Sequence, residues 1–294
     1  MDFLGLSLPG LLSQLLLGLV NGSFYAILSL GLAVIFGLLN VINFAHGALF
    51  MMGAVITWMA MNYFGINYWV MLIVAPLVVG AFGVVVERLL LRWIYKLDHL
   101  YGLLLTLGLT LLIEGIFRSV YGVSGLGYDT PDLLSGGTNL GFMFLPNYRA
   151  WVVVASVTVC LATWFVIEKT KLGAYLRAGT ENPRLVEAFG VNVPVMVTLT
   201  YAFGAALAAF AGVLSAPVYQ VSPLMGQNLI IVVFAVVVIG GMGSIMGSIL
   251  TGLGLGVIEG LTKVFYPEAS STVVFVIMVI VLLIRPAGLF GKEK

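Results

Sequence analysis

The chain has 294 residues, of which 61% are hydrophobic and only 9% are charged, and its formal net charge is +1. A typical soluble domain carries about 25% charged residues, so this composition excludes a soluble fold. No Asp, Glu, Lys or Arg lies between Asp2 and Glu87, which leaves room for about three membrane spans. The near-neutral charge and the lack of a basic cluster argue against binding to nucleic acid. The sequence therefore predicts an all-α, polytopic transmembrane bundle.

Apolar blocks bounded by polar loops predict about nine spans, with eight or ten as the alternatives. We expect one transmembrane domain over residues 1–294 and no cleavable signal peptide, because no cation precedes the first apolar run. The second and seventh spans are the least regular, since polar residues or glycines interrupt them. The expected spans lie near residues 11–37, 44–63, 69–91, 100–120, 150–167, 195–215, 228–241, 248–265 and 272–286.

The positions of the cations predict the orientation, because cytoplasmic loops of membrane proteins are enriched in Lys and Arg. Three groups of cations follow the third, fifth and ninth spans, whereas Arg118, Arg149 and Lys263 are left for the opposite side. This arrangement predicts an outward-facing N-terminus and a cytoplasmic C-terminus. The expected cytoplasmic cations are Arg88, Arg92, Lys96, Lys169, Lys171, Arg177, Arg184, Arg285, Lys292 and Lys294.

The loop at residues 168–194 is the most charged part of the chain. Within it, Asn182 is a favoured helix N-cap, Pro183 is tolerated at the first helical position, and Gly190 is a typical C-terminal glycine. A membrane protein that keeps a short capped helix in one loop offers it to a partner, although an ordinary solvated loop is the alternative. The candidate contact residues are Arg177, Asn182, Pro183, Arg184, Glu187 and Gly190.

The loop at residues 121–149 is the longest one on the predicted outer side. It is rich in Gly, Ser, Asp and aromatic residues, which favours ordered turns and short interfacial pieces. Two interpretations stay open: a docking surface for an external protein, or a plain connection.

Two acidic residues within apolar segments each have a cation four residues later, Glu114 with Arg118 and Glu259 with Lys263. This spacing puts both partners on one helix face. Intramembrane acids can mark ion pathways, but we favour structural ion pairs near the membrane interface.

Two interrupted segments begin with the same Val-Ile pair, at Val41 and at Val238. Broken helices at membrane depth are tolerated where they are packed in protein or line a cavity, and a break in each half points to a pathway. For His46 a satisfied packing role is the simpler alternative. The candidate pathway residues are Asn40, Asn43, His46, Gly47, Gly240, Gly241, Gly243 and Ser244.

Several catalytic motifs are missing from the sequence. It contains no phosphate-binding loop of the G-x-x-x-x-G-K-[ST] type, no G-x-S-x-G elbow and no H-E-x-x-H pair. With two histidines in the chain, a multi-histidine metal site is excluded. We therefore expect no enzyme and no cofactor in this chain, and any ATP-driven work needs a separate subunit.

Four blocks of the sequence, taken in order, resemble the branched-chain amino-acid ABC transporter permeases, and in particular the shorter of their two paired inner-membrane subunits. The blocks are INFAHGALFMMGA at 42–54, LGAYLRA with ENPRLVEAFGV at 172–191, VIGGMGSIMGSILTG at 238–252 and RPAGLFG at 285–291.

The resemblance implies an importer subunit in the bacterial inner membrane that carries Leu, Ile and Val. It also implies as partners a second permease, two cytoplasmic ATPase subunits that bind ATP and Mg, and an external solute-binding protein. Residues 182–190 would then be the coupling helix. The alternatives are a permease for urea, short amides or another small solute, and a self-sufficient secondary transporter or channel.

Overall fold

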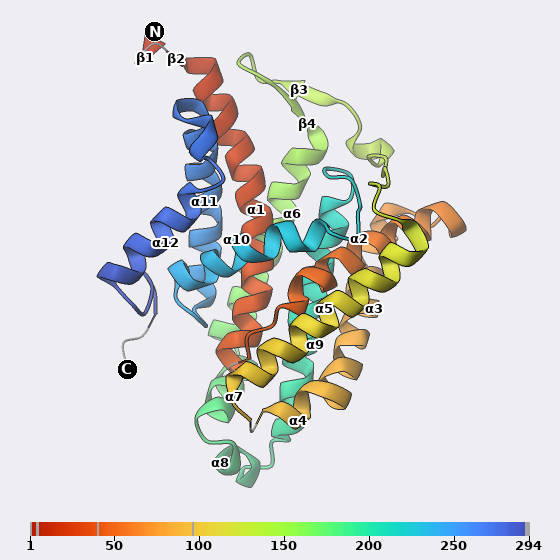
Figure 1. Ribbon diagram of the computed structural model, residues 1–294, viewed down its shortest axis with the longest axis vertical. Coiled ribbons are helices and arrows are strands. Elements are labelled where there is room, and N and C mark those ends of the chain that lie inside the picture. The colour runs from red at the N-terminus through yellow and green to blue at the C-terminus, as the bar shows by residue number, and fades with distance from the viewer. Residues whose placement is uncertain (1, 4–5, 40, 96, 292–294) are drawn as a thin grey trace. The chain divides into compact units, whose positions relative to one another are not determined.

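The computed structural model describes residues 2–3, 6–39, 41–95 and 97–291, and these residues are mostly helical (Figure 1). A helix is present at each of the nine predicted spans. These helices are α1 (Leu8–Leu39), α2 (Ala45–Phe64), α3 (Tyr68–Val86), α5 (His99–Tyr121), α6 (Asn147–Lys169), α9 (Val193–Ser215), α10 (Met225–Gly240), α11 (Ile245–Phe265) and α12 (Val273–Ile284).

Within the described residues, seven of these helices are long and apolar enough to cross a membrane. The other two, α10 and α12, are apolar but have only 16 and 12 residues. A span needs about 20 residues, so these two predicted spans are shorter than expected. The helical, polytopic fold class is confirmed.

The remaining elements are short. The third span continues through a π-helical turn at Glu87–Leu91 into α4 (Arg92–Ile94), and α7 (Lys171–Glu181) and α8 (Pro183–Ala188) follow α6. Two small antiparallel pairs form, β1 (Asp2–Phe3) with β2 (Leu6–Ser7) and β3 (Gly137–Asn139) with β4 (Phe144–Pro146). Single 3-10 turns lie at Asp132–Leu134 and Pro267–Ala269.

The chain forms two compact units that alternate along the sequence. The first comprises Met1–Ser29, Asp129–Cys160 and Ile231–Lys294, and the second comprises Leu30–Tyr128 and Leu161–Ile230. The division passes through α1, α6 and α10.

In the second unit, α9 packs along α2 and α3. The close approach depends on small residues, because a Cβ at Gly53 would clash with the backbone of Ala209, and a Cβ at Gly212 would clash with the Phe50 carbonyl. Small residues at membrane helix interfaces let backbones come near enough for extensive van der Waals contact. Small residues on α2 and α9 therefore set the close approach of these two helices.

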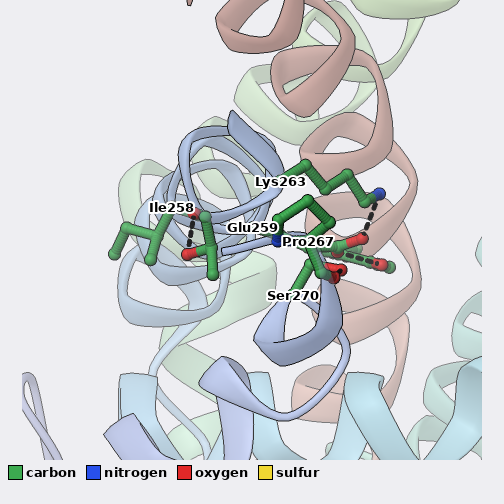
Figure 2. Close-up of polar contacts among 7 residues, drawn as sticks. Ile258, Glu259, Lys263, Pro267 and Ser270 are labelled. Atoms are coloured by element: carbon green, nitrogen blue, oxygen red, sulfur yellow. Dashed lines mark hydrogen bonds and ion pairs between the residues drawn. The ribbon is translucent and has the colours of Figure 1, made fainter. Parts of the chain in front are cut away.

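In the first unit, α1 and α11 are in close contact by the same means. Gly22 on α1 faces Gly252 and Gly256 on α11 with no room for a Cβ on any of the three. One polar contact joins the same helices: Tyr25 Oη donates to Glu259 Oε2 at 2.7 Å. Lys263 Nζ lies 2.7 Å from Glu259 Oε1, so the second predicted ion pair is confirmed (Figure 2).

Replacing Gly53 by alanine should destabilise the protein. The added Cβ forces α2 and α9 apart, and overpacking of this kind costs about 1–3 kcal/mol. Thermal unfolding of the detergent-purified protein should show a lower midpoint. The matched control is Gly108→Ala on α5, where nothing lies within 4 Å of the added Cβ. An unchanged midpoint for Gly53→Ala would contradict the packing described here.

Candidate functional site

The helix predicted in the charged loop is present as α8. Asn182 Oδ1 accepts a hydrogen bond from the Leu185 amide at 3.1 Å, Pro183 is the first helical residue, and Gly190 has φ +83°. Both caps therefore use the expected residues. A positive φ suits glycine because an L side chain is strained there.

Two large exposed side chains of α8 and its C-cap are apolar ones that sequence reasoning passed over. Leu185 is 54% exposed and Phe189 is 78% exposed, while Val186 is buried. Arg184 and Glu187 are exposed as well. Leu185 and Phe189 are four residues apart, a spacing that puts two side chains on one helical face and could have identified them. The tip of the loop thus presents an apolar pair beside two charges.

A second helix, α7, precedes α8 and was not predicted. Arg177 on α7 donates to the Ile167 carbonyl at 2.9 Å and lies 3.4 Å from Glu168 Oε2. Gly173 leaves no room for a Cβ against the Ile167 carbonyl, so α7 is tightly packed on the end of α6. Arg177 therefore helps to hold α7 against the end of α6. Its contact with a partner stays a prediction.

The first interruption is shorter than predicted. Asn40 lies outside the described residues, residues 41–44 separate α1 from α2, and both His46 and Gly47 are already inside α2. Thr106 on α5 supports the break: its hydroxyl accepts from the Phe44 amide at 3.2 Å and lies 3.2 Å from the Ile42 carbonyl oxygen. A side chain thus replaces the missing helical hydrogen bonds.

The pathway candidates at this break are buried. Asn43 is 1% exposed, and its Nδ2 donates to Tyr201 Oη at 3.3 Å, whereas its Oδ1 has no hydrogen-bond partner. His46 is fully buried with its ring against Gly31, which agrees with a packing role. Gly47 crosses Gly226 of α10 so closely that neither has room for a Cβ. These placements leave the predicted pathway role of the three residues untested.

The second interruption covers residues 241–244, since Gly240 is the last residue of α10. Gly241 and Gly243 have φ +98° and +85°, and Ser244 caps α11 by accepting from the Gly247 amide at 3.1 Å. The Leu289 and Phe290 amides donate to the Ile239 and Gly240 carbonyls at 2.8 and 3.1 Å. The C-terminal segment of the same unit therefore supplies hydrogen-bond donors to the backbone carbonyls at this break. A pathway role for the residues of the break stays a prediction.

Glu87 forms a buried network that sequence reasoning did not find. It is 2% exposed, Thr198 donates to its Oε2 at 2.6 Å, and Tyr95 donates to its Oε1 at 3.1 Å. Burial and the nearby carboxylate raise the pKa of Tyr95 well above its ordinary value, so this hydroxyl keeps its proton. Glu87 begins a π-helical turn, an irregularity that often accompanies functional sites. The network joins the end of α3 to the first turns of α9.

The predicted pairing of Glu114 with Arg118 is wrong. Glu114 is 4% exposed, and Gln227 Nε2 donates to its Oε2 at 2.5 Å. Arg118 is exposed and forms no ion pair with Glu114 among the described contacts. The spacing allowed the pair, but Glu114 turns into the protein, where it meets a residue 113 positions away. Its Oε1 is buried without a partner.

The predicted outer loop begins against a second segment of the same unit. Leu126 pairs with Val221 through backbone hydrogen bonds of 2.8 and 3.0 Å, and Trp58 Nε1 donates to the Gly127 carbonyl at 3.0 Å. Burial raises the pKa of Tyr128 to about 12, so this side chain stays neutral. Further along, the 3-10 turn and the β3–β4 hairpin agree with the expected ordered pieces. The start of this loop is thus fixed to the segment before α10.

Comparison with known sequences decides the family. The family described as "Branched-chain amino acid transport system / permease component" matches residues 14–282. The chain belongs to this family. It is a multi-pass inner-membrane permease, which agrees with the apolar helices.

Named relatives agree with this membership. The chain is 29% identical over 298 residues to the high-affinity branched-chain amino acid transport system permease protein LivH of Escherichia coli, covering 96% of each protein. It is 30% identical over 303 residues to BraD of Pseudomonas aeruginosa, with the same description and coverage. The galactofuranose transporter permease protein YtfT of Escherichia coli is 30% identical over 191 residues, which is 61% of this chain and 54% of YtfT.

The Glu87 network should stabilise the permease. Glu87→Ala leaves the hydroxyls of Tyr95 and Thr198 without their buried acceptor, at an expected cost of about 3 kcal/mol. Glu87→Gln keeps the shape and should cost less. The control is Glu168→Gln, which removes a half-exposed ion pair and should change stability by about 0.5 kcal/mol or less. Thermal unfolding of the three variants in detergent checks this order, and equal midpoints would refute it.

Proposed function

We propose that the chain is a membrane-spanning subunit of an ATP-driven ABC importer and forms part of the route for branched-chain amino acids. The family description and the two relatives covered over 96% of their length support this solute class. The partial match to a sugar permease supports a second candidate, a sugar or another small solute, over a shorter region.

The exposed apolar pair at α8, Leu185 and Phe189, is the main structural reason to expect that a partner protein binds this loop. Leu185 and Phe189 are large, more than half exposed, and located in the most charged loop, away from the apolar spans. Burying exposed apolar surface of this kind against a partner is favourable. We propose that this partner is a cytoplasmic ATPase subunit and that two such subunits bind ATP and Mg. On this proposal the loop 168–194 and the C-terminus are cytoplasmic, and the N-terminus faces outward.

The other partners follow from the same proposal. A second homologous permease completes the route, and an external solute-binding protein docks on the loop 121–149 and on the segment 218–227. The backbone pairing of Leu126 with Val221 supports this choice, because it fixes the start of the loop to the segment before α10. The chain itself performs no enzymatic reaction and holds no cofactor. Among the described residues, no group of three or more His, Cys, Asp or Glu could hold a metal ion.

Reconstitution in liposomes tests the function. The complex with its ATPase subunits and binding protein should take up labelled leucine only when ATP is present on the ATPase side. The purified chain alone should neither hydrolyse ATP nor accumulate leucine, since its sequence has no phosphate-binding loop. Uptake driven by a proton or sodium gradient without ATP would instead identify a secondary transporter. ATP-driven uptake of a sugar but not of leucine would favour the second candidate.

Changing α8 should uncouple ATP hydrolysis from transport. Phe189→Ser removes most of the exposed apolar surface, and Gly190→Val strains a residue with φ +83° that ends the helix. An L residue in this conformation costs about 1–2 kcal/mol, which would loosen the C-cap. We expect less leucine moved per ATP hydrolysed in both variants.

The matched control for strain is Gly65→Val, because Gly65 caps α2 with φ +63° and has nothing within 4 Å. It carries the same backbone penalty outside the charged loop, so its transport per ATP should equal that of the unchanged protein. Equal coupling in Phe189→Ser, Gly190→Val and the control would remove α8 from the coupling surface.

A further inference from the structure

One face of α5 carries three buried polar side chains at a spacing of four residues. Thr106, Thr110 and Glu114 are 0%, 6% and 4% exposed. Residues four apart lie above one another on a helix, so the three form a polar stripe. The opposite face of α5 is apolar and more than half exposed at Leu104, Leu111, Leu112 and Ile116. The helix therefore turns a lipid-compatible face outward and a polar face inward.

The polar stripe has an unsatisfied hydrogen-bond acceptor near each end. At one end, Glu114 Oε1 is buried without a partner. At the other end, Thr106 bonds to the break, where Asn43 Oδ1 is also buried without a partner. The helix rises by 1.5 Å per residue, so Thr106 and Glu114 are about 12 Å apart along its axis. Both unsatisfied atoms are oxygens that can only accept, provided that the carboxylate is ionised.

Glu114 differs in this respect from the other buried acids. Both carboxylate oxygens of Glu87 accept hydrogen bonds, and both oxygens of Glu259 are partnered by Tyr25 and Lys263. A buried carboxylate without full pairing costs several kcal/mol. A ligand that brings both a positive charge and N–H donors would satisfy this site.

Glu114 lies one side chain away from the surface of the described chain. Gln227, which bonds to Glu114, is exposed and lies in the first turn of α10. Its neighbour Gly226 is the residue that crosses Gly47 at the start of α2. The carboxylate is therefore beneath an exposed amide side chain, next to the helix crossing that leads to the break at residues 41–44.

We infer that Glu114 binds the ammonium group of the transported amino acid and that Asn43 accepts the same group further along the stripe. This inference rests on the proposed function, since it assigns the polar stripe to the route of a zwitterionic solute. Thr106 and Thr110 precede Glu114 on the same face of α5, and their hydroxyls offer additional oxygen lone pairs. Because Thr106, which bonds to the break, is about 12 Å from Glu114 along the helix axis, the two acceptors act one after the other and not together. Because each acceptor binds the ammonium group weakly, the amino acid is released again and can move along the route.

A binding experiment on the assembled transporter without its binding protein tests the site directly. The probe is 3-methylbutylamine, which has the ammonium and the side chain of leucine but no carboxylate, and saturation-transfer NMR reports weak binding. We expect a signal with the unchanged protein. In Glu114→Gln the affinity should fall about tenfold, as for the loss of one charge-assisted hydrogen bond. The counter-probe, 4-methylpentanoate, has the side chain of leucine but no ammonium group. Its affinity should therefore be the same for the unchanged protein and for Glu114→Gln.

Glu259→Gln is the matched control, because Glu259 is also a buried acid within a span but is fully paired. It should bind the amine as the unchanged protein does. If Glu114→Gln does not assemble, Glu114→Asp replaces it, and the retracted carboxylate should bind the amine with intermediate affinity. No amine signal with the unchanged protein, or equal affinity in the Glu114 variants, would overturn the inference.

Leucine uptake by the reconstituted complex separates this inference from the function on which it rests. Glu114→Gln should lower the maximal rate about tenfold and leave unchanged the half-saturating leucine concentration, which the binding protein sets. ATP-driven uptake at the full rate in Glu114→Gln would overturn the site and keep the function. No ATP-driven uptake in the unchanged complex would refute the function, while the amine experiment would still decide whether Glu114 binds an ammonium group.

Discussion

The hydrocarbon core of a membrane offers no hydrogen bonds, so a chain that interrupts its helices there must satisfy the freed backbone groups itself. The permease does this at both interruptions, by different means. At residues 41–44 a threonine hydroxyl from α5 bonds to the Phe44 amide, and at residues 241–244 amides of the C-terminal segment bond to the last carbonyls of α10. The first solution leaves a polar side chain beside the break, whereas the second closes the break with backbone. The constraint is the same, and at the first break Asn43 Oδ1 is left without a partner.

The three buried acids follow the same constraint. Glu87 and Glu259 each have a donor on both oxygens, and each joins two helices that glycines and alanines already hold close together. Such acids contribute to the structure because their charge is neutralised or fully hydrogen-bonded within the chain. Glu114 has a donor on one oxygen only. The difference lies in the partners and not in the residue type, so composition alone could not separate the three.

Features that depend on neighbouring residues were predictable from the sequence. The spans follow from apolar length, and the caps of α8 follow from Asn182, Pro183 and Gly190, because capping acts over three or four residues. Features that depend on distant residues were not. The partner of Glu114 is 113 positions away and the partner of Glu87 on α9 is 111 positions away, and no local spacing encodes either contact. The predicted pairing of Glu114 with Arg118 was wrong because it assigned a local partner to Glu114, whose side chain turns into the protein.

The charged loop combines a fixed base with an exposed tip. Arg177 and Gly173 hold α7 against the end of α6, where a guanidinium and the absence of a Cβ allow direct contact with the Ile167 carbonyl. Beyond it, α8 is capped at both ends but presents Leu185 and Phe189 to solvent. In the coupling role proposed above, the satisfied caps would keep the short helix in shape when a partner pushes on it, and the contacts of α7 with the end of α6 would pass the displacement on to that span. A flexible loop of the same composition would absorb the displacement, which is why the caps and the tight seat at Gly173 matter as much as the exposed apolar pair.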